Sequence, residues 1–470
     1  MGKRNKKKYF NNILILDTAT KGKTVAKTSI GEIIFLSSGV PGDIVDIETY
    51  NKKKGFFEGN IIKFNELSKY RVKPKCEHFG VCGGCKWQHM SYESQLQFKS
   101  KEVKENIKRI AGIKIDNEIP IMPARDPYYY RNKLEFSFSN QRWLTTEEIN
   151  SNKEIDKNAL GFHKAGMWDK VVDINKCHLQ IEPSNEIRNS IKNYADKNKL
   201  DFFDPKNKNG LLRNLMIRST IDGQIMVLIQ FYQENKTEIL ALLNYIVDQF
   251  PKINSLLYVI NRKANDTIFD QEIKLFYGKD HITEKMEGLF FKITAKSFYQ
   301  TNPEQAFQLY KIVRNFADLK GDELIYDLYT GTGTIAQFIS KNALKVIGVD
   351  VVPESILAAR ENAVFNKIKN VEFEVGDIKN VFNETFINNH GKPSIIITDP
   401  PREGMHLLVL KQIIEIKPEK IIYISCNSST QARDISLIKH LYEISKINAV
   451  DMFPQTHHVE NVVLLKKIVK

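Results

Sequence analysis

Alternating apolar and polar positions mark the first 64 residues as a series of short strands. The runs are ILIL, TVAKT, EIIFL, DIVDIET and FEGNIIKF, and turn-forming segments such as TKGK and SSGVPGD separate them. Strands this short and this closely spaced predict a small β-barrel over residues 1–64. Such barrels often bind nucleic acid, but many mediate other contacts.

The middle of the chain, residues 65–290, mixes helical and strand periodicities. Apolar residues three and four positions apart predict a helix over about 91–112, and KLEFSFS, LMIRST and QIMVLIQFY predict strands. We therefore expect a central α+β domain. The segment YYYRNKLEF interleaves aromatic and basic residues, as single-stranded RNA sites do. Taken alone, it is more typical of an ordinary strand that carries an arginine.

Strands and helices alternate from about residue 291 to residue 470. ELIYDLY, KVIGVD, VEFEVGD, SIIITDPP and KIIYISCN predict buried strands with helices between them, and two more strands end the chain without an intervening helix. This order predicts an α/β domain with a doubly wound, mostly parallel, Rossmann-like sheet. An antiparallel hairpin should close its C-terminal edge.

Charge and hydropathy narrow the classes of partner. The 470 residues suffice for several domains, and 69 Lys and Arg against 56 Asp and Glu leave a net charge of +13. This excess favours a polyanion such as nucleic acid, although a lysine-rich proteome would produce it too. The chain has no apolar run of membrane-spanning length and no signal-peptide core. We expect a cytoplasmic monomer without a membrane partner.

Polar residues follow the first two strands of the predicted sheet. The turn DLYTGTGT contains Gly331 and Gly333, which let a ligand approach the backbone, and Asp350 ends the next strand. Ligands of doubly wound sheets bind at these strand ends. The turn lacks the full dinucleotide-binding pattern. It resembles the first motif of S-adenosylmethionine-dependent methyltransferases, which implies that Asp350 accepts hydrogen bonds from the ribose.

The fourth strand of the sheet ends in DPPREG. Enzymes that methylate exocyclic amines commonly place an aromatic residue after the two prolines to stack on the base. Arg402 occupies this position, so an amine acceptor is disfavoured. Asp399 can contact the methyl donor or the target base, although a carboxylate at a turn is common for structural reasons alone.

A solitary thiol, Cys426, ends the strand KIIYIS. Cysteines at strand ends are usually small core residues, but this one lies at the edge where the other turns meet. Methylation of uracil C5 requires such a thiol: a thiolate adds to C6, C5 attacks the sulfonium methyl group, and a base removes the C5 proton. The small residues NSST after Cys426 should leave room for a substrate.

Five ordered segments together resemble the RNA uracil-5-methyltransferase family: SFYQTNPEQA, DLYTGTGT, DPPREG, YISCNSSTQARD and DMFPQTHHVENVVLL. The resemblance implies an enzyme of class EC 2.1.1 in which Cys426 is the nucleophile and Glu460 the base. From the residues alone, His457 and His458 could also take the proton. The resemblance further implies these contacts to S-adenosylmethionine: Gln300, Tyr329, Asp350 and Asp399.

The other four cysteines suggest a metal centre. Cys76, Cys82 and Cys85 lie together in CEHFGVCGGC, and Cys177 lies in INKCHLQ. Disulfides are not expected in a cytoplasmic protein. Three clustered ligands and one distant ligand favour a [4Fe–4S] cluster. Zinc, which usually binds two close pairs, stays open. The resemblance to one branch of the family implies the cluster.

That branch also carries a TRAM domain, an RNA-binding barrel that residues 1–64 resemble in GVPGDIVDIE. It implies that Arg131 and Lys133 contact RNA, that the helix near 91–112 packs on the catalytic domain, and that the product is 5-methyluridine in 23S ribosomal RNA. A transfer RNA uracil-5-methyltransferase and a non-catalytic RNA-binding protein stay open. A cytosine-5-methyltransferase is disfavoured, because DPPREG contains no cysteine.

Overall fold

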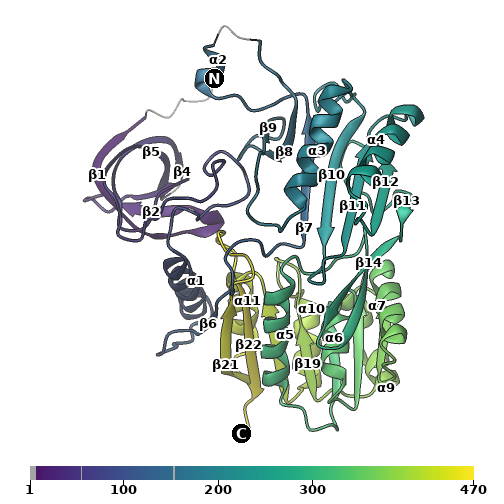
Figure 1. Cartoon of the computed structure of the whole chain (residues 1–470). Coiled ribbons are helices and arrows are strands. Elements are labelled where there is room, and N and C mark those ends of the chain that lie inside the picture. The colour runs from purple at the N-terminus through teal and green to yellow at the C-terminus, as the bar shows by residue number, and fades with distance from the viewer. Residues whose placement is uncertain (1–6, 54, 152–153, 470) are drawn as a thin grey trace.

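The N-terminal segment forms a closed five-stranded barrel in the computed structural model, which describes residues 7–53, 55–151 and 154–469 (Figure 1). Its strands run in the order β1-β2-β3-β5-β4 around a core that includes Ile15, Ile34 and Phe57. They are β1 (Tyr9–Thr18), β2 (Thr24–Lys27), β3 (Ile33–Leu36), β4 (Ile44–Lys53) and β5 (Phe56–Glu66). The predicted barrel is therefore present, and part of its basic leader lies outside the described residues.

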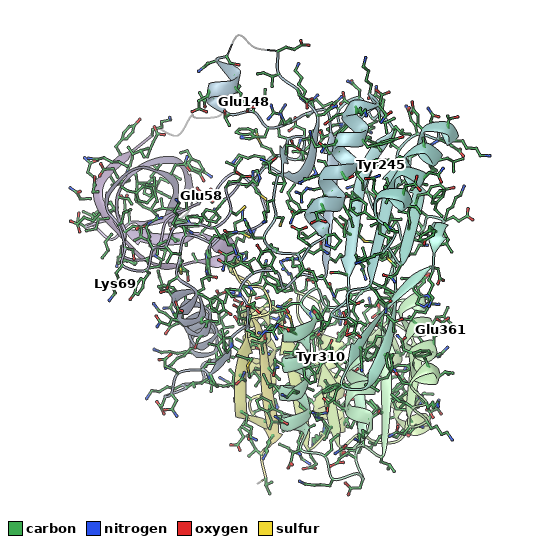
Figure 2. All side chains as sticks on the ribbon, in the orientation of Figure 1. Glu58, Lys69, Glu148, Tyr245, Tyr310 and Glu361 are labelled. Carbon is green, nitrogen blue, oxygen red and sulfur yellow. The ribbon has the colours of Figure 1, made fainter. Side chains whose placement is uncertain are left out.

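The central domain is built on a seven-stranded sheet in the order β13-β12-β11-β10-β7-β8-β9. Helices α3 (Ser184–Lys197) and α4 (Lys236–Gln249) pack on it, and the rings of Tyr194 and Tyr245 join them at 4.4 Å between centroids (Figure 2). The strands are β7 (Lys133–Ser139), β8 (Ala159–His163), β9 (Val171–Asp173), β10 (Leu212–Ser219), β11 (Ile225–Phe231), β12 (Ser255–Ile260) and β13 (Lys274–Gly278).

The C-terminal domain contains an eight-stranded sheet in the order β18-β17-β16-β19-β20-β22-β21-β6. Its strands are β16 (Leu324–Leu328), β17 (Lys345–Asp350), β18 (Val371–Val375), β19 (Ile395–Thr398), β20 (Lys420–Ser425), β21 (Tyr442–Val450), β22 (Glu460–Lys467) and β6 (Ile121–Met122). The strands from β18 to β20 are parallel, and β22 runs antiparallel to both β20 and β21. The doubly wound sheet with a C-terminal hairpin is confirmed.

Helices cover both faces of this sheet. One face packs against α5 (Pro303–Ala317), α6 (Thr334–Ser340) and α7 (Pro353–Phe365). The other face packs against α9 (Glu384–His390), α10 (Leu407–Ile416) and α11 (Ser428–Ile438). Among the described residues, no helix has both the length and the apolar character needed to cross a bilayer.

One helix leaves the central part of the sequence and joins the catalytic domain. Helix α1 (Tyr92–Asn106) continues into a π-helical turn (Ile107–Ala111), and the left-handed Gly112 ends it. These helical segments pack beside α11 and β21, and β6 extends the catalytic sheet (Figure 1). The hairpin of β14 (His281–Met286) and β15 (Leu289–Thr294) contributes to the core of the same domain.

Candidate active site

The carboxyl ends of four parallel strands meet at one edge of the catalytic sheet. They present the glycine turn after β16, Asp350 at the end of β17, Asp399 after β19 and Cys426 after β20. Strand β22 runs the other way and begins at the same edge with Glu460. Because Ser425 is paired with Asn461, the next residue on each side, Cys426 and Glu460, lie beside one another. The fold therefore brings the predicted nucleophile and base together.

The glycine turn combines a packing requirement with open space. A Cβ at Gly333 would lie 2.6 Å from the Phe373 ring, whereas a Cβ at Gly331 would meet no atom of the described chain within 4 Å. The Gly331 amide donates to the Asp350 carboxylate at 2.9 Å, and Val352 donates to its other oxygen at 2.9 Å. Each carboxylate oxygen keeps lone pairs for a further donor. The turn therefore suits a ligand that carries hydroxyl groups.

A buried carboxyl group, Asp327, lies under the glycine turn. Its Oδ2 accepts from Thr330 at 2.6 Å, and its Oδ1 has no partner among the described residues. Burial raises the pKa of Asp327 to about 7. A cavity of about 630 Å³ opens beside the turn and is lined by Thr332, Val352 and Phe298, among others. An unpartnered buried acceptor favours a ligand with a donor or a positive charge.

The two remaining predicted cofactor contacts lie in loops near this edge. Gln300 is half-buried, and its carbonyl oxygen accepts from Asn132 at 3.1 Å. It precedes Asn302, whose side chain caps α5 by accepting from the Gln305 amide at 3.2 Å, as the sequence predicts. Tyr329 is half-buried with a φ of 65° and packs against the core beneath α10 and α11.

The residues that follow Cys426, NSST, begin helix α11 and make packing contacts. Asn427 caps α11 by accepting from the Ser429 amide at 3.1 Å, and it donates to the Arg402 carbonyl at 3.0 Å. Ser428 is buried and accepts from Asn106 of α1 at 2.8 Å. Small polar residues at a strand–helix junction also suit a helix cap and close packing, and the room for a substrate beside them stays a prediction.

Arg402 is the functional residue that the sequence interpretation missed. It was used only to exclude an amine acceptor, yet its guanidinium group contacts the Cys426 thiol and lowers that pKa. Its Nη2 also lies 3.3 Å from Nδ1 of His458. Burial, together with the carboxyl groups of Glu460 and Asp399, outweighs this effect and raises the pKa of Cys426 to about 11. The signal in the sequence was a basic residue, Arg402, in a turn at the same edge of the sheet as the solitary thiol of Cys426.

The pKa values of Glu460 and of the two histidines at this edge are shifted in opposite directions. It is 7% exposed, and burial and the Asp399 carboxylate raise its pKa well above the ordinary value. Burial and nearby cations lower the pKa of His457 to about 4 and that of His458 to about 3. Burial raises the pKa of Asp399 to about 6. Both histidines are therefore weak bases at neutral pH, and the geometry favours Glu460.

The four cysteines of the central part gather around a separate cavity of about 190 Å³. Cys76, Cys82 and Cys85 come from one loop and Cys177 from the segment before α3. Over residues 7–53, 55–151 and 154–469, no group of three or more His, Cys, Asp or Glu residues is arranged to hold a metal ion. No cysteine in those ranges forms a disulfide.

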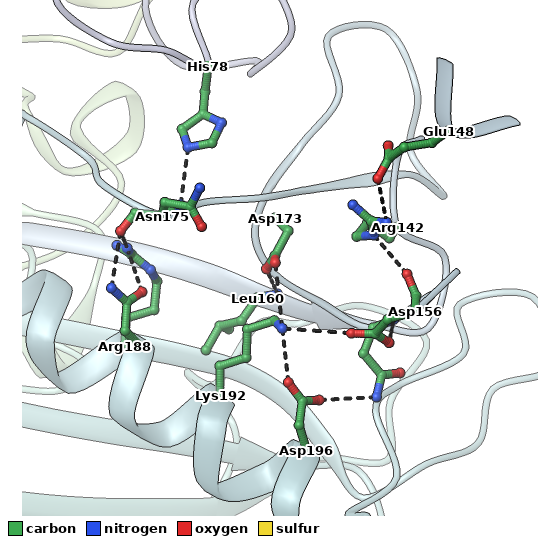
Figure 3. A network of polar contacts seen from close by, with 12 residues as sticks. His78, Arg142, Glu148, Asp156, Leu160, Asp173, Asn175, Arg188, Lys192 and Asp196 are labelled. Atoms are coloured by element: carbon green, nitrogen blue, oxygen red, sulfur yellow. Dashed lines mark hydrogen bonds and ion pairs between the residues drawn. The ribbon is translucent and has the colours of Figure 1, made fainter. Parts of the chain in front are cut away.

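A buried polar network joins the two cysteine segments (Figure 3). Arg188 of α3 is 1% exposed and donates to the Asn175 carbonyl at 2.6 Å and to Asn185 Oδ1 at 2.8 Å. The Asn185 amide pairs with the backbone of Cys177, at 2.8 Å to its nitrogen and 3.1 Å to its oxygen. The backbone amide of Asn175 donates to Nε2 of His78 at 3.1 Å, and His78 lies two residues after Cys76. A buried cation thus lies beside the thiols.

The two predicted RNA contacts lie in different surroundings. Arg131 lines the cysteine cavity, and its guanidinium carbon is 5.3 Å from the centroid of the Phe453 ring. Lys133 begins β7, pairs with Glu135 at 2.5 Å and lines a cavity of about 270 Å³ together with Thr301.

Comparisons with known proteins agree over almost the whole chain. The profile of the tRNA (Uracil-5-)-methyltransferase family matches residues 204–468. A Bacteroides thetaiotaomicron protein described as an uncharacterized RNA methyltransferase is 50% identical, covering 95% of this chain and 99% of that protein. A Porphyromonas gingivalis protein with the same description is 48% identical, covering 96% and 98%.

A solved structure also matches nearly end to end. The crystal structure of the Pyrococcus abyssi tRNA (uracil-54, C5)-methyltransferase in complex with S-adenosyl-L-homocysteine superposes with a TM-score of 0.75 at 27% identity. The match covers 96% of this chain and 100% of that protein. The similarity therefore includes the barrel and the central domain as well as the C-terminal sheet.

Proposed function

Because this chain belongs to the tRNA (uracil-5-)-methyltransferase family and is an RNA methyltransferase, we propose that it methylates C5 of a uridine in RNA. The product would be 5-methyluridine. The observation that carries this proposal is the adjacency of Cys426 and Glu460 at the edge that holds the glycine turn. A thiol and a strong carboxylate base at one point are the two groups that methylation at an unreactive ring carbon requires.

Cys426 acts as the nucleophile in this proposal. Its thiolate adds to C6 of the uracil ring, which places electron density on C5 and allows C5 to accept the methyl group. The Arg402 guanidinium favours the thiolate form by its contact with the sulfur. Glu460 then takes the C5 proton, the C6–sulfur bond breaks, and the ring becomes aromatic again with the thiolate released. For each methyl group transferred, one methylated uridine, one proton and one S-adenosylhomocysteine would leave.

S-adenosylmethionine is the cofactor of this family, and it supplies an electrophilic methyl group when bound. We propose that Gln300, Tyr329, Asp350 and Asp399 hold it. Two features support the fit: the open space beside Gly331 and the Asp350 carboxylate, which backbone amides hold in place. The buried carboxyl groups of this edge also suit a positively charged sulfonium.

For the cavity lined by the four cysteines of the central part we propose a [4Fe–4S] cluster, bound by Cys76, Cys82, Cys85 and Cys177. The four thiols line one cavity, and Arg188 supplies a buried positive charge beside them. A zinc ion needs four ligands about 2.3 Å from a single point. No such arrangement exists among the described residues. What supports the four-iron cluster is that three cysteines close together in the sequence and one distant cysteine line a single cavity, and zinc is the alternative.

Ribosomal RNA is the substrate that we propose first, with 23S RNA as the target. The TRAM-like barrel of residues 1–64 would contribute to RNA binding, and Lys133 and Arg131 are candidate contacts. Transfer RNA is the second candidate, and the end-to-end similarity to the tRNA (uracil-54, C5)-methyltransferase of Pyrococcus abyssi favours it. Both substrates fit the same chemistry.

The test is methyl transfer from tritiated S-adenosylmethionine to unmodified 23S RNA and to unmodified transfer RNA, with mass-spectrometric mapping of the product. The wild-type protein should form 5-methyluridine in one of them. Cys426→Ala should lower the rate by at least about 10³-fold, because the uncatalysed C5 is too weak a nucleophile. Its RNA affinity should not change. Methyl transfer by Cys426→Ala at the wild-type rate would refute the mechanism.

A further inference from the structure

The loop between β21 and β22, residues 451–458, leads directly to Glu460 and is held on several sides. Five consecutive carbonyl groups of this loop accept hydrogen bonds from distant segments. The contacts are Asp451 with Gln305 (3.0 Å), Met452 with Asn302 (3.0 Å), Phe453 with Lys99 (3.2 Å), Pro454 with Tyr130 (2.9 Å) and Gln455 with the Lys86 and Trp87 amides (2.9 and 3.0 Å). The position of the loop is therefore set by its neighbours.

Gln95 of α1 connects this loop to the cysteine-rich segment. The side chain is fully buried, and its Nε2 donates to the carbonyls of Trp87 at 3.1 Å and Met90 at 2.9 Å. The same nitrogen donates to Gln455 Oε1 at 3.0 Å, and Gln95 Oε1 accepts from the Gln455 amide at 3.0 Å. One amide group thus ties the chain just after Cys85 to the chain just before Glu460.

The backbone of Gln455 needs this support. Its φ is 66°, a left-handed conformation that is strained for a residue with a side chain. The next residue, Thr456, lines the cavity of the four cysteines. The chain just after the cysteine loop is therefore in direct hydrogen-bond contact with the loop 451–458.

We infer that Gln95, through Gln455, is a positioning residue for Glu460, so that the cysteine loop holds the base in place at the end of β22. This inference rests on the proposed role of Glu460. It makes a specific kinetic claim, because the base acts only after the methyl group has been transferred. Displacement of Glu460 would slow the release of the covalent RNA adduct and leave its formation unchanged.

The experiment compares two rates in Gln95→Met, which has a similar size but lacks all four hydrogen bonds. One is single-turnover methyl transfer from tritiated S-adenosylmethionine. The other is the decay of the RNA–protein adduct, followed on denaturing gels. A base displaced by about 1 Å can cost about 10²-fold. We expect slower adduct decay by about that factor, adduct accumulation during turnover, methyl transfer within about 2-fold of wild type, and an unchanged iron content.

A milder variant and a control complete the design. Gln455→Ala keeps its carbonyl bonds to Lys86 and Trp87, so it should show the same pattern to a smaller degree and serves if Gln95→Met fails to fold. The control is Asn261→Leu, since Asn261 is a fully buried amide of the central domain that bonds Gln230 and Thr267 and does not contact the loop 451–458. It should leave the ratio of the two rates unchanged.

Two outcomes overturn the inference alone, and a third overturns the proposed function together with it. If the wild type forms and releases an adduct, and the Gln95 and Gln455 variants match its ratio of rates, the positioning role alone is wrong. An equal slowing of both steps also contradicts it, because it indicates a general loss of packing. If the active wild type forms no adduct, the proposed mechanism falls, and the inference falls with it.

Discussion

At the scale of single residues, the thiol of Cys426 lies under opposing influences. Burial and two carboxyl groups raise its pKa, and only the Arg402 guanidinium works in the other direction. At neutral pH most of the free enzyme therefore carries a protonated, unreactive thiol. Arg402 is therefore the residue on which the thiolate fraction of Cys426 should depend.

We expect alkylation of Cys426 to report this balance. Because the pKa of the thiol is about 11, the thiolate fraction and the alkylation rate should rise about 10-fold per pH unit between pH 7 and 10. Arg402→Met should lower the rate at pH 8 by about 10-fold, since it removes the one group that favours the thiolate. Peptide mass spectrometry after iodoacetamide treatment measures this rate.

Arg433→Met is the matched control, because Arg433 braces the same turn through the Glu403 carbonyl and is not among the groups that shift the Cys426 thiol. It should leave alkylation unchanged. Wild-type alkylation of Cys426 in Arg402→Met would contradict the assigned role of the guanidinium group.

At the scale of elements, the turn between β16 and α6 contains one glycine that packs against the core and one that faces open space. Gly331 and Gly333 both have left-handed backbones, with φ of 57° and 72°. An added methyl group at Gly333 would clash with Phe373, whereas one at Gly331 would enter the open space beside Asp350. Alanine at either position would be strained in a left-handed backbone, but only at Gly333 would it also clash with the core. The two substitutions therefore form a matched pair.

Gly333→Ala should destabilise the fold by about 1–3 kcal/mol more than Gly331→Ala does, because it overpacks the core against Phe373. Gly331→Ala should instead weaken S-adenosylmethionine binding by at least about 10-fold, since its methyl group occupies ligand space. Denaturant unfolding and calorimetric titration measure the two effects. Wild-type affinity in Gly331→Ala would show that the cofactor does not bind at this turn.

The elements themselves were largely predictable from the sequence. Periodicity located the barrel strands and the alternating sheet, because each depends on local patterns. The helix cap formed by Asn427 was not predicted, because the same small polar residues also suit a loop beside a substrate. The strand β6, only two residues long, was missed because its pairing with β21 is set by the tertiary fold.

At the scale of the whole molecule, contacts between residues far apart in the sequence join helix α1 to the loop that precedes Glu460. The ion pair of Lys99 with Asp451, 2.5 Å long and fully buried, joins α1 to the loop that precedes Glu460. Breaking such a pair from one side costs about 3–5 kcal/mol. No sequence pattern indicates this pair, nor the hydrogen bonds of Gln95, since both depend on packing between segments about 350 positions apart.

The network around Arg188 predicts how the cysteine site depends on its surroundings. Arg188→Met removes the buried cation and the link between the two cysteine segments. It should lower the affinity for iron by about 10- to 100-fold, as loss of an outer-shell partner typically does. Iron and sulfide analysis after anaerobic reconstitution, with a chelator in competition, measures this affinity.

Arg213→Met controls for the loss of a buried arginine as such. Arg213 is 4% exposed, lies between Phe203 and Tyr232, and bonds carbonyls of the 261–264 segment. This variant should retain its iron. Full iron retention by Arg188→Met would contradict the role given to Arg188, and colourless wild-type protein with stoichiometric zinc would contradict the proposed cluster.

The central claim is that Cys426 forms a transient covalent bond to C6 of the target uridine, and RNA containing 5-fluorouridine tests it most directly. Fluorine at C5 cannot be removed by Glu460 as a proton, so the adduct should persist after methyl transfer. Mass spectrometry of the digested complex should then locate the RNA fragment on Cys426. An enzyme preparation shown to be active that yields no adduct, or an adduct on another residue, would contradict the account.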